Sequence, residues 1–216
     1  MGLVKHLIVN ADDFGYSYGI NKGIIEAHTK GIVTATSVMV DSIAAHEASE
    51  LVQYPELSVG LHLVVKDMDI DKVPAELARQ VDKFIEIMGV EPDHLDTHKI
   101  FTTEGNLKEV LLDYANTANI PLRRFSGAKF IGSFFGPHSD GDLSVAQLKK
   151  TIDEATDEYN EIMCHVGYSD DYLRQTSSYN DQRQQELATI CNPSIRSYLE
   201  ENEIKLCNWK ELHITT

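Results

Sequence analysis

The sequence predicts an α/β fold, a distorted or incomplete (β/α) barrel of the TIM-barrel type. Strand-like apolar runs alternate with amphipathic helical segments from end to end, which is typical of a parallel sheet covered by helices. The chain has 216 residues, fewer than the ~250 of a typical eight-unit barrel. Polar side chains recur where strands end, as in folds whose active sites lie at that edge. An open doubly wound sheet satisfies the alternation too, but the length favours the incomplete barrel.

The first half is expected to hold three strands and three helices. Ser17 is placed to cap a helix whose face carries Ile20, Ile24 and Ala27, and Gly31 would end it. Val, Thr and Ser dominate the second strand, and a proline at the first helical position opens the third helix. The predicted strands are Lys5–Asn10, Thr34–Val40 and Leu57–Leu63, and the predicted helices are Ser17–Gly31, Ala44–Gln53 and Pro74–Gly89.

The second half continues the alternation, with apolar residues at helical spacing between short apolar runs. The predicted strands are His94–Thr97, Pro121–Phe125, Ala128–Ile131, Glu161–His165 and Ile204–Asn208. The predicted helices are Leu107–Asn119, Ser144–Tyr159, Asp181–Ile190 and Ser194–Asn202. Two long polar loops, Gly132–Asp142 and Gly167–Tyr179, are expected to serve function, because long loops in compact domains often do.

Composition narrows the class of protein. A hydrophobic content of 42% suits one core, so residues 1–216 are expected to form a single domain. The formal net charge of -15 disfavours nucleic acid and anionic membrane as partners. No leading signal-like segment and no membrane-length apolar stretch is visible, so a cytoplasmic location is expected. Three cysteines without a C-x-x-C pair predict no disulfide framework.

Chemistry-bearing residues fall at the ends of four predicted strands. Asp12 and Asp13 follow the first predicted strand, His62 lies at the end of the third, and His165 ends the strand Glu161–His165. Asp96 and His98 lie at the end of the strand that begins at His94, and their spacing of two puts both on one side of it. Each alone has an ordinary explanation: a cap, a turn or a buried core histidine. Their convergence on one edge of a parallel sheet predicts an active site.

One carboxylate with two imidazoles is a ligand set that leaves metal positions open for water and substrate. These donors suit zinc and equally iron, cobalt, manganese or nickel, whereas calcium prefers oxygen ligands alone. Of two adjacent aspartates, one can hold the metal while the other handles protons, because a bound cation relieves their repulsion. The pattern leaves open which aspartate does which.

Several segments resemble one known family in the correct order. They are Ile8–Gly15, Asn21–Ala27, Gly31–Ser37, Gly60–Leu63, His94–His98, Glu161–Tyr168 and Tyr179–Leu187. Together they cover nearly the whole chain and are similar to the YdjC-like carbohydrate deacetylases, a family that includes chitooligosaccharide deacetylase.

The resemblance implies a distorted barrel of the glycoside hydrolase/deacetylase type and a hydrolase that removes acetyl from N-acetylated sugars or small chitooligosaccharides. Position by position, it implies Asp13, His62 and His98 as metal ligands. Asp12 would be the general base and His165 the general acid.

The resemblance further implies one divalent metal ion, with zinc or magnesium foremost and cobalt, manganese or nickel open. It implies a small N-acetylated sugar as partner and a homodimer. Asp96, Arg123, Tyr168 and Arg183 are expected to bind substrate or to support the ligands.

The chain departs from the family pattern at three places. Lys99-Ile100-Phe101 stands where the family has further histidines, the stretch between His62 and Asp96 is shorter, and Val166 replaces a proline. The first two departures concern the substrate rather than the metal. Two alternatives therefore accompany the deacetylase hypothesis: a barrel that binds metal or sugar without hydrolysis, and a metal hydrolase acting on another substrate class.

Overall fold

A computed structural model describes residues 4–66, 69–99, 106–134 and 141–212 of the chain. Its centre is a sheet of seven strands, in which every pairing is parallel. The strands are β1 (Lys5–Phe14), β2 (Ala35–Val38), β3 (Ser58–Leu63), β4 (Leu95–Thr97), β5 (Lys129–Ile131), β6 (Tyr159–Cys164) and β7 (Ile204–Leu206). Their order is β4-β3-β2-β1-β6-β5, with β7 paired to β1.

The sheet is an open half-barrel. Within the described ranges no ladder joins β4 to β5, and only an isolated bridge from Leu95 to Leu122 extends the β4 edge. Strand β1 is the hub, because it pairs with β6 along one edge and with β7 and then β2 along the other. The prediction of an incomplete barrel is confirmed, and it is favoured over the alternative of an open doubly wound sheet.

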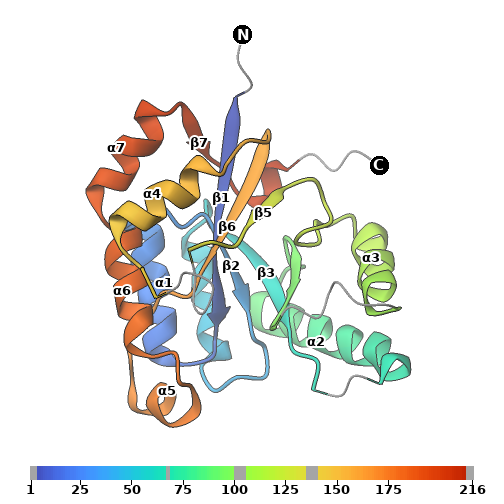
Figure 1. Ribbon diagram of the computed structural model, residues 1–216. Helices are drawn as coiled ribbons and strands as arrows, with labels where there is room; N and C mark the ends of the chain where they lie inside the picture. Colours follow the sequence, from blue (N-terminus) through green and yellow to red (C-terminus); the bar gives the residue numbers. More distant parts are fainter. Residues whose placement is uncertain (1–3, 67–68, 100–105, 135–140, 213–216) are drawn as a thin grey trace.

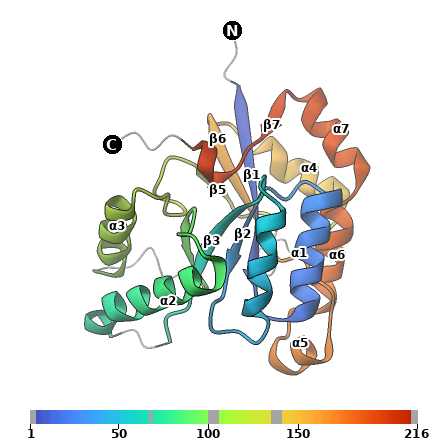
Figure 2. The same ribbon diagram turned by 180° about the vertical axis from the view of Figure 1, so that it is seen from behind.

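Helices flank the sheet in two groups. Figures 1 and 2 show α1 (Tyr18–Lys30), α4 (Val145–Asp153), α6 (Asp181–Ile190) and α7 (Pro193–Glu201) on one side, and α2 (Val73–Met88) with α3 (Asn106–Ala118) on the other. The short helix α5 (Asp171–Thr176) lies beyond the carboxyl end of β1. No helix of the described residues is both long and apolar enough to cross a membrane.

Local signals explain the main helix boundaries. The Ser17 side chain accepts a hydrogen bond from the Ile20 amide at 3.3 Å, as an N-cap should. Helix α2 has a proline in its first turn and ends at Gly89, whose φ of 72° is the left-handed conformation that glycine adopts freely.

Several predicted elements differ from the structure. Strand β1 continues past Asn10 through both aspartates to Phe14, and Ala45–Gln53 is a 3-10 helix, η1, in place of an α-helix. Segment Pro121–Phe125 forms only the bridge at Leu122.

The C-terminal half adds two differences. Helix α4 ends at Asp153, because the chain must reach strand β6, which begins at Tyr159. The predicted loop Gly167–Tyr179 contains helix α5, whose cap is Asp170, while the loop Gly132–Asp142 lies partly outside the described residues.

Strand β3 makes a tight contact with His94. A Cβ atom built on Gly60 would lie 2.5 Å from ring atoms of His94, so only glycine fits there. The His94 ring stacks on Trp209 at 5.1 Å, and burial lowers the pKa of His94 to about 3. His94 is thus a neutral packing residue, consistent with its being left out of the predicted site.

Candidate active site

The end of β1 is irregular where the aspartate pair lies. The pairing of β1 with β2 shifts register between Ala11 and Phe14, and such irregularities redirect side chains. Asp13 has a φ of 72°, a conformation that is strained for a residue with a side chain. The following turn is fixed by the Gly15 amide, which donates to the Asn21 side chain at 2.6 Å. The side chains of Asp12 and Asp13 therefore make different contacts.

Asp13, His62 and His98 form a group that could hold a metal ion. Asp13 Oδ1 lies 3.3 Å from His62 Nε2 and 3.3 Å from His98 Nδ1. A tetrahedron of ~2.0 Å metal–ligand bonds has edges of about 3.3 Å. Asp13 and His62 are buried, and the His98 side chain is 30% exposed. One carboxylate and two imidazoles at this spacing fit a divalent cation that keeps an open side toward solvent.

The second ring nitrogen of His62, Nδ1, contacts polar side chains on the side away from Asp13. It lies 2.6 Å from Asp96 Oδ1 and 3.2 Å from Ser37 Oγ. Burial alone would lower the pKa of His62, but the carboxylates of Asp96 and Asp13 outweigh it and raise the pKa to about 10. A carboxylate on one nitrogen orients the ring and leaves the other for a metal, and an arriving cation must displace the proton there.

A second cluster of possible donors, made of Asp12, His62 and Asp96, is occupied by Arg123. The Arg123 guanidinium contacts both oxygens of Asp12 at 2.8 Å and Asp96 Oδ2 at 3.0 Å. Its Nε lies 2.5 Å from Glu161 Oε1. One buried cation thus serves three buried carboxylates, and this cluster is an ion-pair network rather than a second metal site.

Glu161 is the member of this network that the sequence prediction missed. Burial raises its pKa to about 7, with Asp12 and Asp96 adding to the rise and Arg123 opposing it. A charged residue inside the otherwise apolar run Glu161–Cys164 was the signal that could have revealed it. Glu161 contacts Arg123 at Nε, whereas Asp12 contacts Nη1 and Nη2.

His165 follows β6 and is held by its main chain. Its amide donates to Glu186 Oε2 at 2.6 Å, and the Tyr179 hydroxyl donates to Oε1 of the same carboxylate. The ring centroids of His165 and Tyr179 are 6.0 Å apart. His165 is the last of the groups that contribute to lowering the pKa of Asp13. Glu186 is a second residue that the sequence prediction missed.

Arg183, from helix α6, reaches the other oxygen of Asp13. Its Nη2 donates to Asp13 Oδ2 at 2.6 Å, and both side chains are buried. Burial would raise the pKa of Asp13, but Arg183 and the two histidines outweigh burial and hold it well below its usual value. Asp13 is therefore a carboxylate anion in the fold.

The structure brings most of the predicted site residues together through their contacts. Joined in this way are Asp12, Asp13, His62, Asp96, His98, Arg123 and Arg183. Tyr168 instead turns toward helix α1, where its hydroxyl donates to Glu26 at 2.6 Å. Substrate binding by Asp96, Arg123, Tyr168 and Arg183 stays a prediction; the first two and Arg183 are buried among charged partners.

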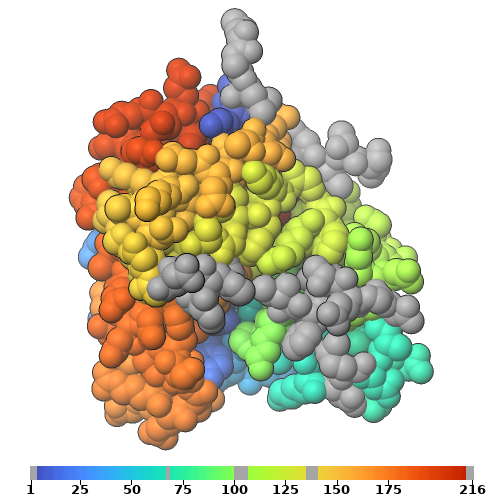
Figure 3. All heavy atoms as spheres, viewed as in Figure 1, coloured from blue at the N-terminus to red at the C-terminus, as the bar shows by residue number. Residues whose placement is uncertain are grey.

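A cleft of about 580 Å³ opens beside His98. Its lining includes Tyr16, Met39, Ile43 and Tyr172, and the two tyrosine rings lie 5.9 Å apart. In the space-filling view, the orange residues of α5 lie at the lower left of the face drawn and the blue-green residues of α2 at its lower right (Figure 3). The cleft gives a ligand access to the exposed edge of the metal group.

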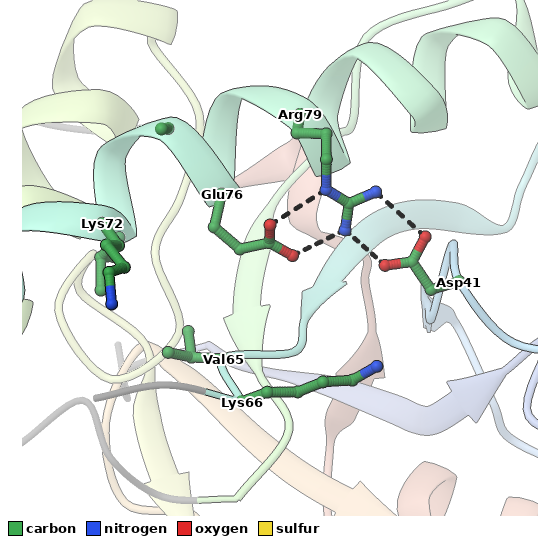
Figure 4. A pocket seen from close by; sticks show the side chains of 8 residues that line it. Asp41, Val65, Lys66, Lys72, Glu76 and Arg79 are labelled. Carbon is green, nitrogen blue, oxygen red and sulfur yellow. Dashed lines mark hydrogen bonds and ion pairs between the residues drawn. The ribbon is translucent and has the colours of Figure 1, made fainter. Parts of the chain in front are cut away.

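A neighbouring cavity of about 550 Å³ shares Asp41, Val65 and Lys66 with this cleft. Figure 4 shows Arg79 between the carboxylates of Glu76 and Asp41, with Lys66 and Lys72 on the other walls. Arg79 Nη1 donates to Asp41 at 3.1 Å. The hollow surface next to the metal group is therefore long and partly charged.

Comparison with known proteins shows which family the chain is similar to. The family model described as YdjC-like protein matches residues 6–201. A carbohydrate deacetylase of Clostridium beijerinckii is 31% identical over 95% of this chain and 99% of its own length. A chitooligosaccharide deacetylase of Proteus mirabilis is 28% identical over 95% of this chain and 98% of its own.

Solved structures show the same architecture. A crystal structure from Enterococcus faecalis, of a protein provisionally described as cleaving cellobiose-phosphate, has a TM-score of 0.86 at 26% identity and covers 96% of this chain and 98% of that one. A family 4 acetyl xylan esterase of Clostridium thermocellum, solved with cobalt, has a TM-score of 0.59 at 12% identity over 96% and 90%; it shares the fold. The match over residues 6–201 shows that this chain belongs to the YdjC-like family.

Proposed function

We propose that the protein is a divalent-metal-dependent hydrolase that removes the acetyl group from an N-acetylated sugar. The observation that carries the proposal is the group Asp13, His62 and His98, in which each histidine nitrogen lies 3.3 Å from Asp13 Oδ1. Relatives that match nearly the whole chain are carbohydrate and chitooligosaccharide deacetylases. Small N-acetylated sugars or chitooligosaccharides are accordingly the proposed substrates.

Asp13, His62 and His98 are the residues that would hold the ion. Zinc or magnesium is the first choice, with cobalt, manganese and nickel as further candidates for this donor set. When bound, such an ion supplies Lewis acidity to the acetamide carbonyl and lowers the pKa of water.

Asp12 is assigned the general base. A carboxylate has about four acceptor positions, and Asp12 uses three, one for Asn10 Nδ2 at 2.8 Å and two for Arg123. Among the described residues none donates to the fourth, on Oδ2, which we assign to the proton of the attacking water. Arg123 and Asn10 fix the carboxylate, so that the proton is accepted at a defined atom.

His165 is assigned the general acid. As the water oxygen bonds to the acetyl carbon and the carbon–nitrogen bond breaks, the imidazolium gives its proton to the leaving nitrogen. Glu186 Oε2 accepts a hydrogen bond from the His165 amide at 2.6 Å and thereby fixes the backbone from which the imidazole extends. The products are acetate and an amino sugar.

Acetate release tests the proposal directly. The metal-stripped protein is assayed with N-acetylated mono- and disaccharides after addition of zinc, magnesium, cobalt, manganese or nickel. Metal-dependent acetate release from at least one sugar is expected. Stoichiometric metal binding with no release from any sugar would contradict the deacetylase assignment and favour one of the two alternatives, another substrate class or a non-hydrolytic barrel.

Loss of one ligand should weaken metal binding. In His98→Ala, the candidate group keeps only Asp13 and His62, so we expect less than stoichiometric metal after dialysis, measured by elemental analysis. His46→Ala is the control, because His46 packs edge-on against Tyr18 and lies outside the metal group. Full metal content in His98→Ala would remove His98 from the ligand set.

Further assignments accompany the proposal. A single domain over residues 1–216, a homodimer and a cytoplasmic location stay predictions. Gel filtration with light scattering measures the oligomeric state, and limited proteolysis tests the domain.

A further inference from the structure

Arg183 contacts a candidate metal ligand without contacting the other two. Its Nη2 lies 2.6 Å from Asp13 Oδ2, whereas the histidine nitrogens lie 3.3 Å from Oδ1 of the same carboxylate. The two oxygens of Asp13 thus face different partners. A carboxylate can bind a cation through one oxygen or through both, and a charged hydrogen bond on Oδ2 favours the one-oxygen mode.

Asp13 needs such a restraint because its backbone is strained. Its φ of 72° lies in the left-handed region, where a residue with a side chain persists only when its surroundings hold it. The register of the β1–β2 pairing also shifts between Ala11 and Phe14, so the strand ladder is irregular at Asp13. A buried arginine 170 positions away in the sequence supplies the restraint through tertiary structure.

Helix α6 is well placed to carry this arginine. The Gly167 amide donates to the Arg183 carbonyl at 3.3 Å, and Arg183 Nε donates to the Tyr179 carbonyl at 3.2 Å. One turn later Glu186 accepts the His165 amide at 2.6 Å. The helix is therefore tied to the end of β6 at two points, which fixes the distance from Arg183 to the site.

We propose that Arg183 is a positioning residue that holds the Asp13 carboxylate with Oδ1 toward the two histidines and restricts Asp13 to one-oxygen metal binding. The inference rests on the proposed metal site and is independent of which sugar, if any, is hydrolysed. It assigns Arg183 a role behind the ligand in place of direct contact with substrate. Removing such a partner typically weakens metal binding by about 10- to 100-fold.

The test is metal binding by Arg183→Met, measured with Co²⁺ alone. Competition with a chromophoric chelator gives the Kd, and the visible spectrum reports coordination, since the Co²⁺ band weakens when more ligand atoms bind. We expect a Kd about 10- to 100-fold higher and a weaker band, because Oδ2 is released. Arg183→Lys, which keeps the charge but not the planar fork, should fall between wild type and Arg183→Met.

The matched control is Arg196→Met, because Arg196 donates to the Gly31 carbonyl at the end of α1. It should leave the Kd and the spectrum unchanged. A folded Arg183→Met with a Kd within twofold of wild type and an unchanged spectrum would overturn the inference. If Arg183→Met does not fold, the same result for Arg183→Lys overturns it. Absence of acetate release with wild-type protein would count against the deacetylase proposal alone.

Discussion

Arg123→Met is expected to destabilise the protein by about 3–5 kcal/mol, the usual loss when one partner of a buried ion pair is removed. Arg123 contacts all three of the carboxylates of Asp12, Asp96 and Glu161, and the four side chains are buried. Without it, the three buried carboxylates lose their shared cation, although Asp96 keeps its contact with His62. Urea unfolding of the metal-free protein at neutral pH measures the loss.

Two further variants show whether a loss of stability in Arg123→Met comes from the ion-pair network. Arg124→Met is the control, because the adjacent guanidinium stacks on Phe130 at 3.8 Å and is not part of the network. Arg123→Lys keeps one positive charge but cannot span Asp12 with two parallel bonds, so its stability should lie between those of wild type and Arg123→Met. Equal unfolding free energies for Arg123→Met and Arg124→Met would show that the network contributes little to stability.

His165→Ala should lower kcat by about 10²- to 10⁴-fold, the range of a single general acid or base. The candidate metal group is formed by Asp13, His62 and His98, so metal content should remain stoichiometric. Steady-state acetate release and elemental analysis on the same preparation separate the two effects.

Tyr198→Phe is a suitable comparison for His165→Ala. Tyr198 lies on α7, and its hydroxyl donates to Asp153 on α4 at 2.5 Å, outside the metal group. Its variant should keep turnover close to wild type. If His165→Ala retained wild-type kcat with full metal, the proton for the leaving nitrogen would have to come from another group.

The sequence predicts the sheet because alternating apolar segments define parallel strands, and parallel strands present their carboxyl ends at one edge. The same pattern predicts that the polar residues at these strand ends gather there, as Asp12, Asp13, His62, Asp96 and His98 do. The ligand set Asp13, His62 and His98 came from the family resemblance, because the pattern alone left open which aspartate would hold a metal.

The support around the ligands could not be predicted in the same way. Arg123 lies 111 positions from Asp12, in a segment where the sequence suggested a strand and the structure has one bridge. Glu161 and Glu186 are each recognisable only as charged residues within buried surroundings, and their partners depend on tertiary packing. A pattern shows that such a residue is unusual but not which cation or amide it contacts.

Helix α5 was missed for a related reason, because six residues are too few for the 3.6-residue period to give a clear signal. The helix at Ala45–Gln53 was predicted, but its 3-10 geometry was not. Their residues take the conformation that neighbouring contacts require.

The hub strand also determines when the site can be completed during synthesis. Asn10 supports Asp12, and Asn10 Oδ1 in turn accepts a hydrogen bond from Trp209 at 3.1 Å, 199 positions later. Translation at about 5–20 residues per second separates these partners by about 10–40 s. Strand β7, which pairs with the first residues of β1, emerges at almost the same late moment. On the ribosome, the nascent chain therefore carries its aspartate pair long before the last strand arrives to support it, and a ribosome that stalls before Trp209 leaves that support incomplete.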